Sequence, residues 1–368
     1  MLFDEYKYTS YTFPEPQYLG AKHTLLAWLN KHMPRNIMSA LDAFSGSQSV
    51  AFFFKQQGFK TITNDFLNFN HQIGLGLIEN KHETLTDDDL LLLTTTDTAP
   101  DPNFQLITET YTDIFFERDE ALFLDAFRRN IDELENPYKK ALAFTVMSRS
   151  LTRKITMGHF AHTQALRYAN CPERLKRNRS LARPVKDIFL ELVPKYNQAV
   201  FDNKQENLSY NMNILDLLPT LDRVDLAYFD PPYCDSHADY QSFYHLLETY
   251  VEYWKDKRFI NTIRRYEPQK FSGFDKKKTV LESFEKLFES AREIPHWLIS
   301  YNNRSYPSVD EFRAFAAKYR DIEVEYKTYE NGRGGKGSVA GSREVLLICK
   351  KRLAVNIPFE NKGTFAYA

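Results

Sequence analysis

Apolar positions in the first eighty residues follow two different periods, one typical of helices and one typical of strands. Leucines at helical spacing within 21–33 predict an amphipathic helix. The short apolar run 36–44 and the β-branched run 59–64 predict strands, and the stretch 48–57 between them predicts a helix. A glycine turn at Gly46 joins the first strand to this helix. The order strand, tight turn, helix, strand predicts a βαβ unit with the layout of a nucleotide-binding fold.

The middle of the chain has a different pattern. Residues 103–206 show helical spacing, many Arg and Lys residues and no strand-like alternation. The strand pattern returns with the apolar run 224–229. Three later strands are predicted at 296–300, 322–327 and 344–349. We therefore predict an α/β fold: a doubly wound, Rossmann-like core with a parallel sheet, formed by residues 1–102 and 207–368, and a mainly helical insertion formed by residues 103–206.

Charge is distributed very unevenly along the chain. The formal net charge is only −1, but residues 149–186 contain ten basic residues opposed by Glu173 alone, which gives this stretch +9. The remaining 330 residues therefore sum to −10. Such a basic stretch either covers a solvated helical surface, where it can pair with the acidic block 87–89, or contacts the phosphates of a nucleic acid.

Three further features restrict the class of protein. The three cysteines are an odd number without the spacing of a zinc site, which fits a reducing cytoplasm and predicts neither disulfides nor a metal centre. The N-terminus lacks the basic-then-apolar layout of a signal peptide, and no apolar run approaches the roughly 20 residues that span a bilayer. We therefore expect a soluble, cytoplasmic protein that binds neither a metal nor a membrane.

The strongest chemical signal is the segment Asp230, Pro231, Pro232 and Tyr233, which directly follows the apolar run 224–229. The exocyclic amine of a nucleobase is a poor nucleophile because its lone pair is conjugated with the ring. A carboxylate at a strand end, together with a carbonyl beside two prolines, offers two acceptors that bind the amine and favour its attack on a methyl group. Tyr233 offers a flat face for the base. The alternative is that the prolines merely end the strand and Tyr233 is a packing residue.

A second signal is the segment Asp42 to Ser47 (DAFSGS), at the end of the first predicted strand. Gly46 lets the backbone approach a bound nucleotide closely, although the segment does not match the GxGxxG fingerprint of dinucleotide binding. By itself it is equally typical of an ordinary strand–helix turn. Asp65, at the end of the second predicted strand, is placed to accept both hydroxyls of a ribose. Together the two features predict a cofactor site.

These residues resemble the adenine-N6 DNA methyltransferases of the restriction–modification and Dam-like kind, in which cofactor motif, target recognition and catalytic motif follow one another. Residues 17–22 (QYLGAK) are similar to the family's Y-[IL]-G-[SA]-K element. Residues 42–46 are similar to its D-x-F-x-G cofactor loop, and 230–233 (DPPY) to its catalytic tetrad. The stretches 240–253 and 298–303 are similar to segments that follow the tetrad in members paired with restriction enzymes.

The resemblance implies a methyltransferase core that uses S-adenosylmethionine. It implies a cofactor site formed by Tyr18, Lys22, Asp42, Phe44, Gly46 and Asp65. The family's acidic residue near the cofactor's adenine is matched best by Asn213, with Asp216 as a rival. Because the family keeps target recognition between its two motifs, the basic stretch is expected to bind double-stranded DNA. The residues expected to do so are Arg149, Arg153, Lys154, Arg167, Arg174, Lys176, Arg177, Arg179 and Arg183.

The function that follows is methyl transfer to N6 of an adenine flipped out of duplex DNA, with a restriction endonuclease encoded alongside as a further partner. Three alternatives stay open at this point: an RNA base methyltransferase, a protein-glutamine methyltransferase, and a catalytically inert nucleic-acid-binding protein. Cytosine-N4 is also open as the target, because that chemistry uses a similar tetrad, usually with serine first.

Overall fold

The computed structural model describes residues 10–14, 16, 18–96, 101–155, 158–234, 239–268, 271–328 and 343–352. Within these residues, a seven-stranded sheet has the order β3-β2-β1-β4-β7-β9-β8, and β5 and β6 form a separate hairpin. The strands are β1 Ser39–Asp42, β2 Lys60–Asn64, β3 Leu208–Tyr210, β4 Leu226–Phe229, β5 Phe259–Ile260, β6 Arg265–Tyr266, β7 His296–Asn302, β8 Asp321–Thr328 and β9 Arg343–Lys350.

The predicted α/β, Rossmann-like core is confirmed, but its sheet is mixed rather than parallel. Neighbouring strands from β3 to β7 run parallel. In contrast, β9 is antiparallel to both β7 and β8. The prediction of a parallel sheet therefore holds for β3, β2, β1, β4 and β7 and is wrong for β8 and β9. These two consecutive strands pair directly, and such strands run antiparallel unless a crossover carries the chain back.

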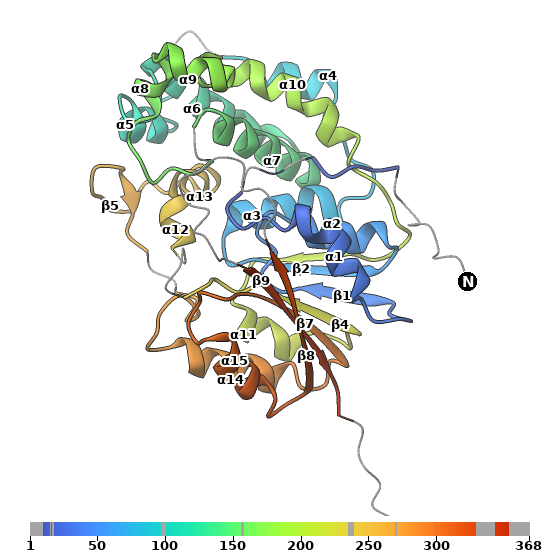
Figure 1. The fold of residues 1–368 in the computed structure, drawn as a ribbon. Coiled ribbons are helices and arrows are strands. Elements are labelled where there is room, and N and C mark those ends of the chain that lie inside the picture. Colours follow the sequence, from blue (N-terminus) through green and yellow to red (C-terminus); the bar gives the residue numbers. More distant parts are fainter. Residues whose placement is uncertain are drawn as a thin grey trace, which may run out of the picture.

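Helices cover both faces of the sheet (Figure 1). One layer contains α1, α2 and α3, and the opposite layer contains α11, α14 and α15. A further group, α4 to α10, lies above the first layer. The helices are α1 Leu26–Lys31, α2 Ser49–Gln56, α3 Asn68–Ile73, α4 Asp87–Thr94, α5 Leu106–Tyr111, α6 Arg118–Glu133, α7 Pro137–Arg153, α8 Ala165–Ala169, α9 Pro172–Arg177, α10 Val185–Asn197, α11 Ile214–Leu217, α12 Tyr240–Phe243, α13 His245–Glu252, α14 Val280–Ser290 and α15 Val309–Ala316.

Helices α4 to α10 pack against the core, and their buried side chains belong, among the described residues, to a cluster that they share with α2, α3 and α13. One buried cluster contains Phe52 of α2, Phe69 of α3, Met147 of α7, Phe189 of α10 and Tyr250 of α13. Burial of large apolar side chains is the main stabilising term in such packing. Helices such as α7 and α10 are therefore held against the helical layer that contains α2 and α3.

Neither a membrane-spanning helix nor a metal-binding cluster is found among the described residues. Among the helices described, none combines the length and the apolar character that crossing a bilayer requires. The same part of the chain holds no cluster of three or more His, Cys, Asp or Glu side chains arranged to bind a metal ion.

Candidate active site

A pocket lies at the carboxyl ends of β1 and β4, where the order of the sheet reverses. In open α/β sheets, ligands bind at this switch point. The pocket brings together every residue that the sequence assigned to the cofactor or to catalysis. These lining residues are Tyr18, Lys22, Asp42, Phe44, Gly46, Asp65, Asn213, Asp230, Pro231, Pro232 and Tyr233. Segments from near the N-terminus and from beyond β4 thus form one site.

The turn after β1 is shaped by Gly46 and braced by Asp65. Gly46 has a φ of +45°, and a Cβ at this position would lie 3.0 Å from the Tyr18 ring, so glycine is favoured on both counts. Its N–H donates to Asp65 Oδ2 at 2.8 Å. Asp65 Oδ1 accepts from the Leu67 N–H at 2.8 Å and the Asn70 amide at 3.1 Å. Burial raises the pKa of Asp65, and these hydrogen bonds oppose the rise.

Asp42 is the last residue of β1, and only one of its two carboxylate oxygens accepts a hydrogen bond within the described residues. The side chain is 1% exposed, and its Oδ2 accepts from the Ala51 N–H at 3.0 Å. Its Oδ1 is buried and has no hydrogen-bond partner within the described ranges. Burial, followed by the charge of Asp230, raises the pKa of Asp42 well above its ordinary value. Leaving a buried acceptor unpaired costs about 1–3 kcal/mol. A donor bound in the pocket would remove this cost.

The Asp230 carboxylate is engaged on both oxygens. Lys22 Nζ lies 2.6 Å from Oδ2, and the Tyr233 hydroxyl donates to Oδ1 at 2.8 Å. Burial by itself lowers the pKa of Lys22, but the surrounding negative groups, Asp230 foremost, leave it well above its ordinary value. Burial and the charge of Asp230 likewise raise the pKa of Tyr233. At neutral pH the acid therefore faces a cationic lysine and a neutral phenol.

A set of parallel aromatic rings supports the segment that carries Lys22. The Tyr18 ring stacks on Tyr244, with centroids 4.7 Å apart and planes at 4°, and lies 5.9 Å from Tyr240. Tyr240 also lines the pocket, together with Asp239 and Gln241. None of these three was predicted as a site residue. The available signal for Tyr240 was its place in an aromatic-rich stretch shortly after the tetrad.

The structure separates the two candidates for the cofactor's adenine. Asn213 lines the pocket, as do Phe44 and Phe66. It also begins α11, since its side chain accepts from the Leu215 N–H at 3.1 Å. Asp216 is exposed and does not line the pocket. The geometry therefore supports Asn213 rather than its rival.

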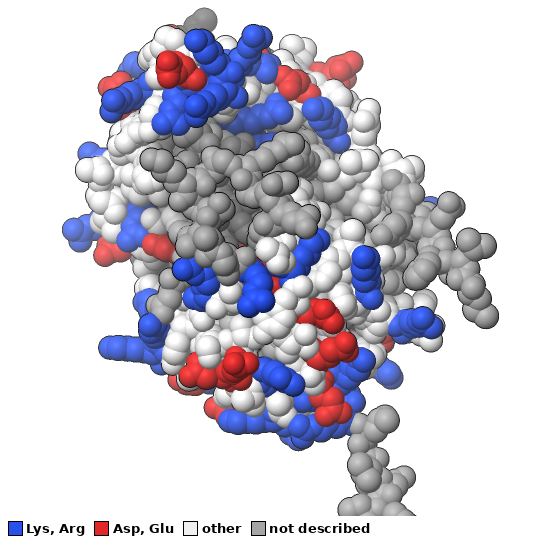
Figure 2. Space-filling view, in the orientation of Figure 1, with Lys and Arg blue, Asp and Glu red and all other residues white. Residues whose placement is uncertain are grey.

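Five of the nine residues expected to bind DNA are exposed. They come from α8, α9 and the turn that follows, and they are Arg167, Arg174, Lys176, Arg177 and Arg179. Figure 2 shows Lys and Arg atoms gathered over this end of the molecule. The Arg174 guanidinium lies over the Tyr168 ring at 4.5 Å. Arg149 is instead half-buried and lines a second, mainly apolar pocket, which Tyr18 lines as well.

The other three basic residues form ion pairs with acids outside the basic stretch. Arg153 and Arg183 lie 3.0 and 2.5 Å from the two carboxylate oxygens of Glu191. Lys154 lies 3.1 Å from Glu120. The charge count along the sequence missed these acids because one precedes the stretch and the other follows it. These three cations therefore tie α7 and the segment before α10 to neighbouring helices.

The fold is an α/β core with a pocket at its switch point, where ligands bind in such sheets, and comparison with known proteins gives the family. The family model of the D12 class N6 adenine-specific DNA methyltransferases matches residues 18–315. The chain belongs to this family, as its motifs predicted. It is 33% identical to the Type II methyltransferase M2.HphI of Haemophilus parahaemolyticus over 347 residues, which is 92% of this chain and 98% of that protein. The family supports adenine-N6 in DNA over the RNA, protein and cytosine alternatives.

Proposed function

We propose that this protein transfers a methyl group from S-adenosylmethionine to N6 of an adenine that has been flipped out of double-stranded DNA. The observation that carries the proposal is the meeting, in one pocket, of the turn after β1 with the segment Asp230 to Tyr233 after β4. A cofactor turn and an amine-binding acid in a single pocket are what a direct transfer between two bound molecules requires. The family match supports the same reaction.

The pocket residues fit S-adenosylmethionine. The unpaired Oδ1 of Asp42 suits the ammonium group of the cofactor. Gly46 lets the turn after β1 lie directly against the Tyr18 ring, and the Phe44 ring, which lines the pocket, offers a face to the adenine. Asp65 and Asn213 would hold the ribose hydroxyls and the adenine edge. When bound, the cofactor supplies a methyl group already activated on a sulfonium sulfur.

The chain's own residues then act on the target amine. Asp230 and the Pro231 carbonyl accept its two hydrogens, which draws the nitrogen lone pair out of conjugation. Because Lys22 occupies Asp230 Oδ2 at 2.6 Å, arrival of the amine rearranges this contact. Tyr233 presents its ring to the base, and the proton leaves after transfer. Positioning and electrostatics therefore account for most of the acceleration.

Delivery of the base requires flipping. The Asp230 side chain is 16% exposed within the pocket, so an adenine stacked in a duplex cannot bring its amine to this carboxylate. The exposed cations of α8 and α9 would hold the DNA backbone while the base enters. By analogy with the Type II methyltransferase to which the chain is similar, we place it in the cytoplasm as the modification enzyme of a restriction–modification pair.

The decisive test replaces Asp230. Asp230→Ala is expected to lower methyl transfer to DNA by at least about 10³-fold, because one of the two acceptors for the amine is lost. The binding constant for S-adenosylmethionine, measured by calorimetry, should change little. Labelled methyl transfer and sequencing that reports modified bases would follow the activity and the target base together. Near-normal turnover in this variant would remove Asp230 from the mechanism and overturn the proposal.

A further inference from the structure

A second basic stretch begins shortly after the tetrad. Residues 255–278 contain nine basic and three acidic residues, a formal charge of +6. The hairpin of β5 and β6 occupies the middle of this stretch, and the exposed lysines Lys276, Lys277 and Lys278 end it. Figure 1 places β5 on the same side of the molecule as α8 and α9. The protein thus carries two cationic regions on one side.

One face of the hairpin is anchored to the helices. Phe259 and Tyr266 are opposite each other in the ladder. Phe259 packs edge-on against Tyr111 at 6.2 Å, and Tyr266, which is buried, packs against Trp254 at 4.7 Å. Side chains alternate between the two faces of a strand. The residues next to Phe259 and Tyr266 along their strands therefore face away from the helices.

The opposite face and the turn carry exposed arginines. Arg258 precedes β5, Arg264 ends the turn, and both are exposed. No ion pair joins either of them to an acid in the described part of the chain. Asn261 and Arg264 adopt φ values of +54° and +51°, which fix the shape of this turn. The arginines differ in this respect from Arg153 and Arg183 of the insertion, whose charges are already paired.

The hairpin is also tied to the rim of the active site. Arg265 Nη1 lies 3.1 Å from Asp239 Oδ2, and the Tyr266 hydroxyl donates to Gln241 Oε1 at 3.4 Å. Both Asp239 and Gln241 line the catalytic pocket. On the C-terminal side, Ser272, Phe274 and Asp275 line it as well. A duplex that delivers a base to this pocket must therefore pass beside the hairpin.

We infer that the β5–β6 hairpin and the lysines at 276–278 form a second DNA-binding surface, which contacts phosphates next to the flipped adenine through Arg258, Arg264, Lys276 and Lys278. This inference rests on the proposed function. A two-stranded ribbon is of a size that fits the major groove of DNA, and exposed arginines bind phosphates in two-point contacts. The exposed cations of α8 and α9 then bind the duplex away from the pocket, and the hairpin binds the part of the duplex that lies next to the pocket.

The test compares two pairs of charge-removing substitutions. In one variant Arg258→Ala is combined with Arg264→Ala. The matched control combines Arg313→Ala with Lys318→Ala, two exposed cations in or just after α15, in the helical layer on the other face of the sheet. Binding of labelled duplex DNA is measured by anisotropy at several salt concentrations, and S-adenosylmethionine affinity and thermal midpoint report on folding.

The hairpin variant is expected to bind DNA at least tenfold more weakly at about 0.1 M salt. The negative slope of log K against log salt should become shallower by about 2, since each lost phosphate contact removes roughly 0.9 from its magnitude. The control should match the unmodified protein. Lys276→Gln combined with Lys278→Gln probes the same surface without altering the hairpin. If the first variant fails to fold, the DNA affinity and salt slope of this second variant still test the inference.

The outcomes separate the inference from the proposed function. If the unmodified protein binds and methylates duplex DNA while both variant pairs keep its slope and affinity, the second surface does not exist and the inference is overturned. If the unmodified protein neither binds nor methylates duplex DNA, the proposed function fails and the inference fails with it. A reduced slope in either variant pair, with the control unchanged, supports the hairpin surface.

Discussion

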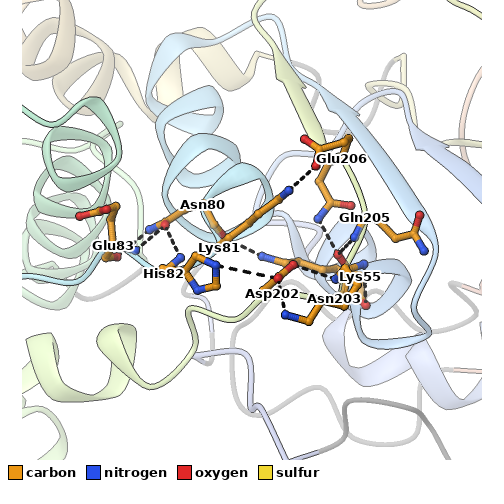
Figure 3. Close-up of polar contacts among 11 residues, drawn as sticks. Lys55, Asn80, Lys81, His82, Glu83, Asp202, Asn203, Gln205 and Glu206 are labelled. Atoms are coloured by element: carbon orange, nitrogen blue, oxygen red, sulfur yellow. Dashed lines mark hydrogen bonds and ion pairs between the residues drawn. The ribbon is translucent and has the colours of Figure 1, made fainter.

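Two lysines are buried within the described residues, and what they face decides how each behaves. Lys22, in the catalytic pocket, faces the Asp230 carboxylate at 2.6 Å. Lys55 of α2 makes its hydrogen bonds to backbone carbonyls, donating to Leu77 O at 2.9 Å and to Asn80 O at 2.8 Å. Figure 3 shows the contact between Lys55 and Asn80. Burial lowers the pKa of both side chains. For Lys22 the facing charges reverse this effect, whereas the pKa of Lys55 falls to about 7.

The difference shows that burial alone does not give a lysine a catalytic role. Lys55 closes the end of a π-helix, Gly74–Glu79, whose last carbonyls have no partner within that helix. Its ammonium also lies over the Phe201 ring at 4.6 Å, where the chain returns from the insertion to the sheet. Lys22 instead keeps its charge and holds an acid that the substrate must reach. Lys55 therefore stabilises the fold, whereas Lys22 positions a residue of the candidate active site.

Of the substitutions that test this comparison of the two lysines, Lys22→Met is expected to have the largest effect, because it keeps most of the side-chain volume and removes the charge. The Asp230 carboxylate then stays buried without a counter-charge, and breaking such a pair costs about 3–5 kcal/mol. We expect methyl transfer to fall at least roughly 100-fold, and the free energy of unfolding to drop by about 3 kcal/mol. Single-turnover transfer of labelled methyl and urea unfolding measure the two effects.

A double-mutant cycle with Asp230→Asn provides the control. If Lys22 acts through Asp230, the stability cost of Lys22→Met should shrink markedly once the acid has been replaced by its neutral amide. An unchanged cost in the Asp230→Asn background would show that Lys22 stabilises the pocket by packing and not by charge.

The sequence predicted those features that depend on local order along the chain. Strand β4 and the acid that follows it were found from an apolar run and a proline pair, and Gly46 from its place after the first strand. Because parallel strands end at the same edge of a sheet, predicting the strands was sufficient to bring Asp42, Asp65 and Asp230 to one edge.

Features that depend on partners distant in sequence could not be predicted. The contact between Lys22 and Asp230 joins residues more than two hundred positions apart, and nothing in either motif states that they touch. The acids that pair with Arg153 and Lys154 lie outside the basic stretch for the same reason. Lys55 stands in the predicted helix 48–57 among phenylalanines, and only the packed structure shows what its amine binds.

A moderate effect is expected from Lys55→Met, and it should depend on pH. The folded pKa of Lys55, about 7, is below that of the unfolded chain, so the unfolded chain binds more protons above pH 7. Stability contributed by this group is therefore lowest below pH 7 and rises as pH increases toward about 10. Between pH 7 and 9 the unmodified protein should gain about 2 kcal/mol relative to the variant.

Urea unfolding of both proteins at a series of pH values measures this gain, and methyl transfer at one pH serves as the control. Because Lys55 does not line the pocket, the variant should methylate DNA at the rate of the unmodified protein. Parallel stability curves for the two proteins from pH 6 to 9 would show that Lys55 titrates at its ordinary value.

The smallest effect is expected from Asp202→Asn, which removes a carboxylate that raises the pKa of Lys55. Asp202 acts on Lys55 from the return segment and also pairs with Lys204 at 2.8 Å. Asp202→Asn should lower the pKa of Lys55 further and cost less than about 1 kcal/mol at pH 6, where Lys55 is charged. At pH 9 Lys55 is neutral in the folded protein, so this part of the cost should vanish.

Measuring Asp202→Asn in the Lys55→Met variant separates the part of its cost that depends on Lys55. The loss of the Lys204 contact is the same whether Lys55 or methionine is present, so it cancels in the comparison. In unfolding experiments at pH 6, Asp202→Asn should therefore cost more in the unmodified protein than in the Lys55→Met variant, and equally in both at pH 9. Equal costs at both pH values would mean that Asp202 and Lys55 do not interact. The contrast with Lys22 would then rest on the backbone carbonyls alone, since no carboxylate would act on Lys55 in the way that Asp230 acts on Lys22.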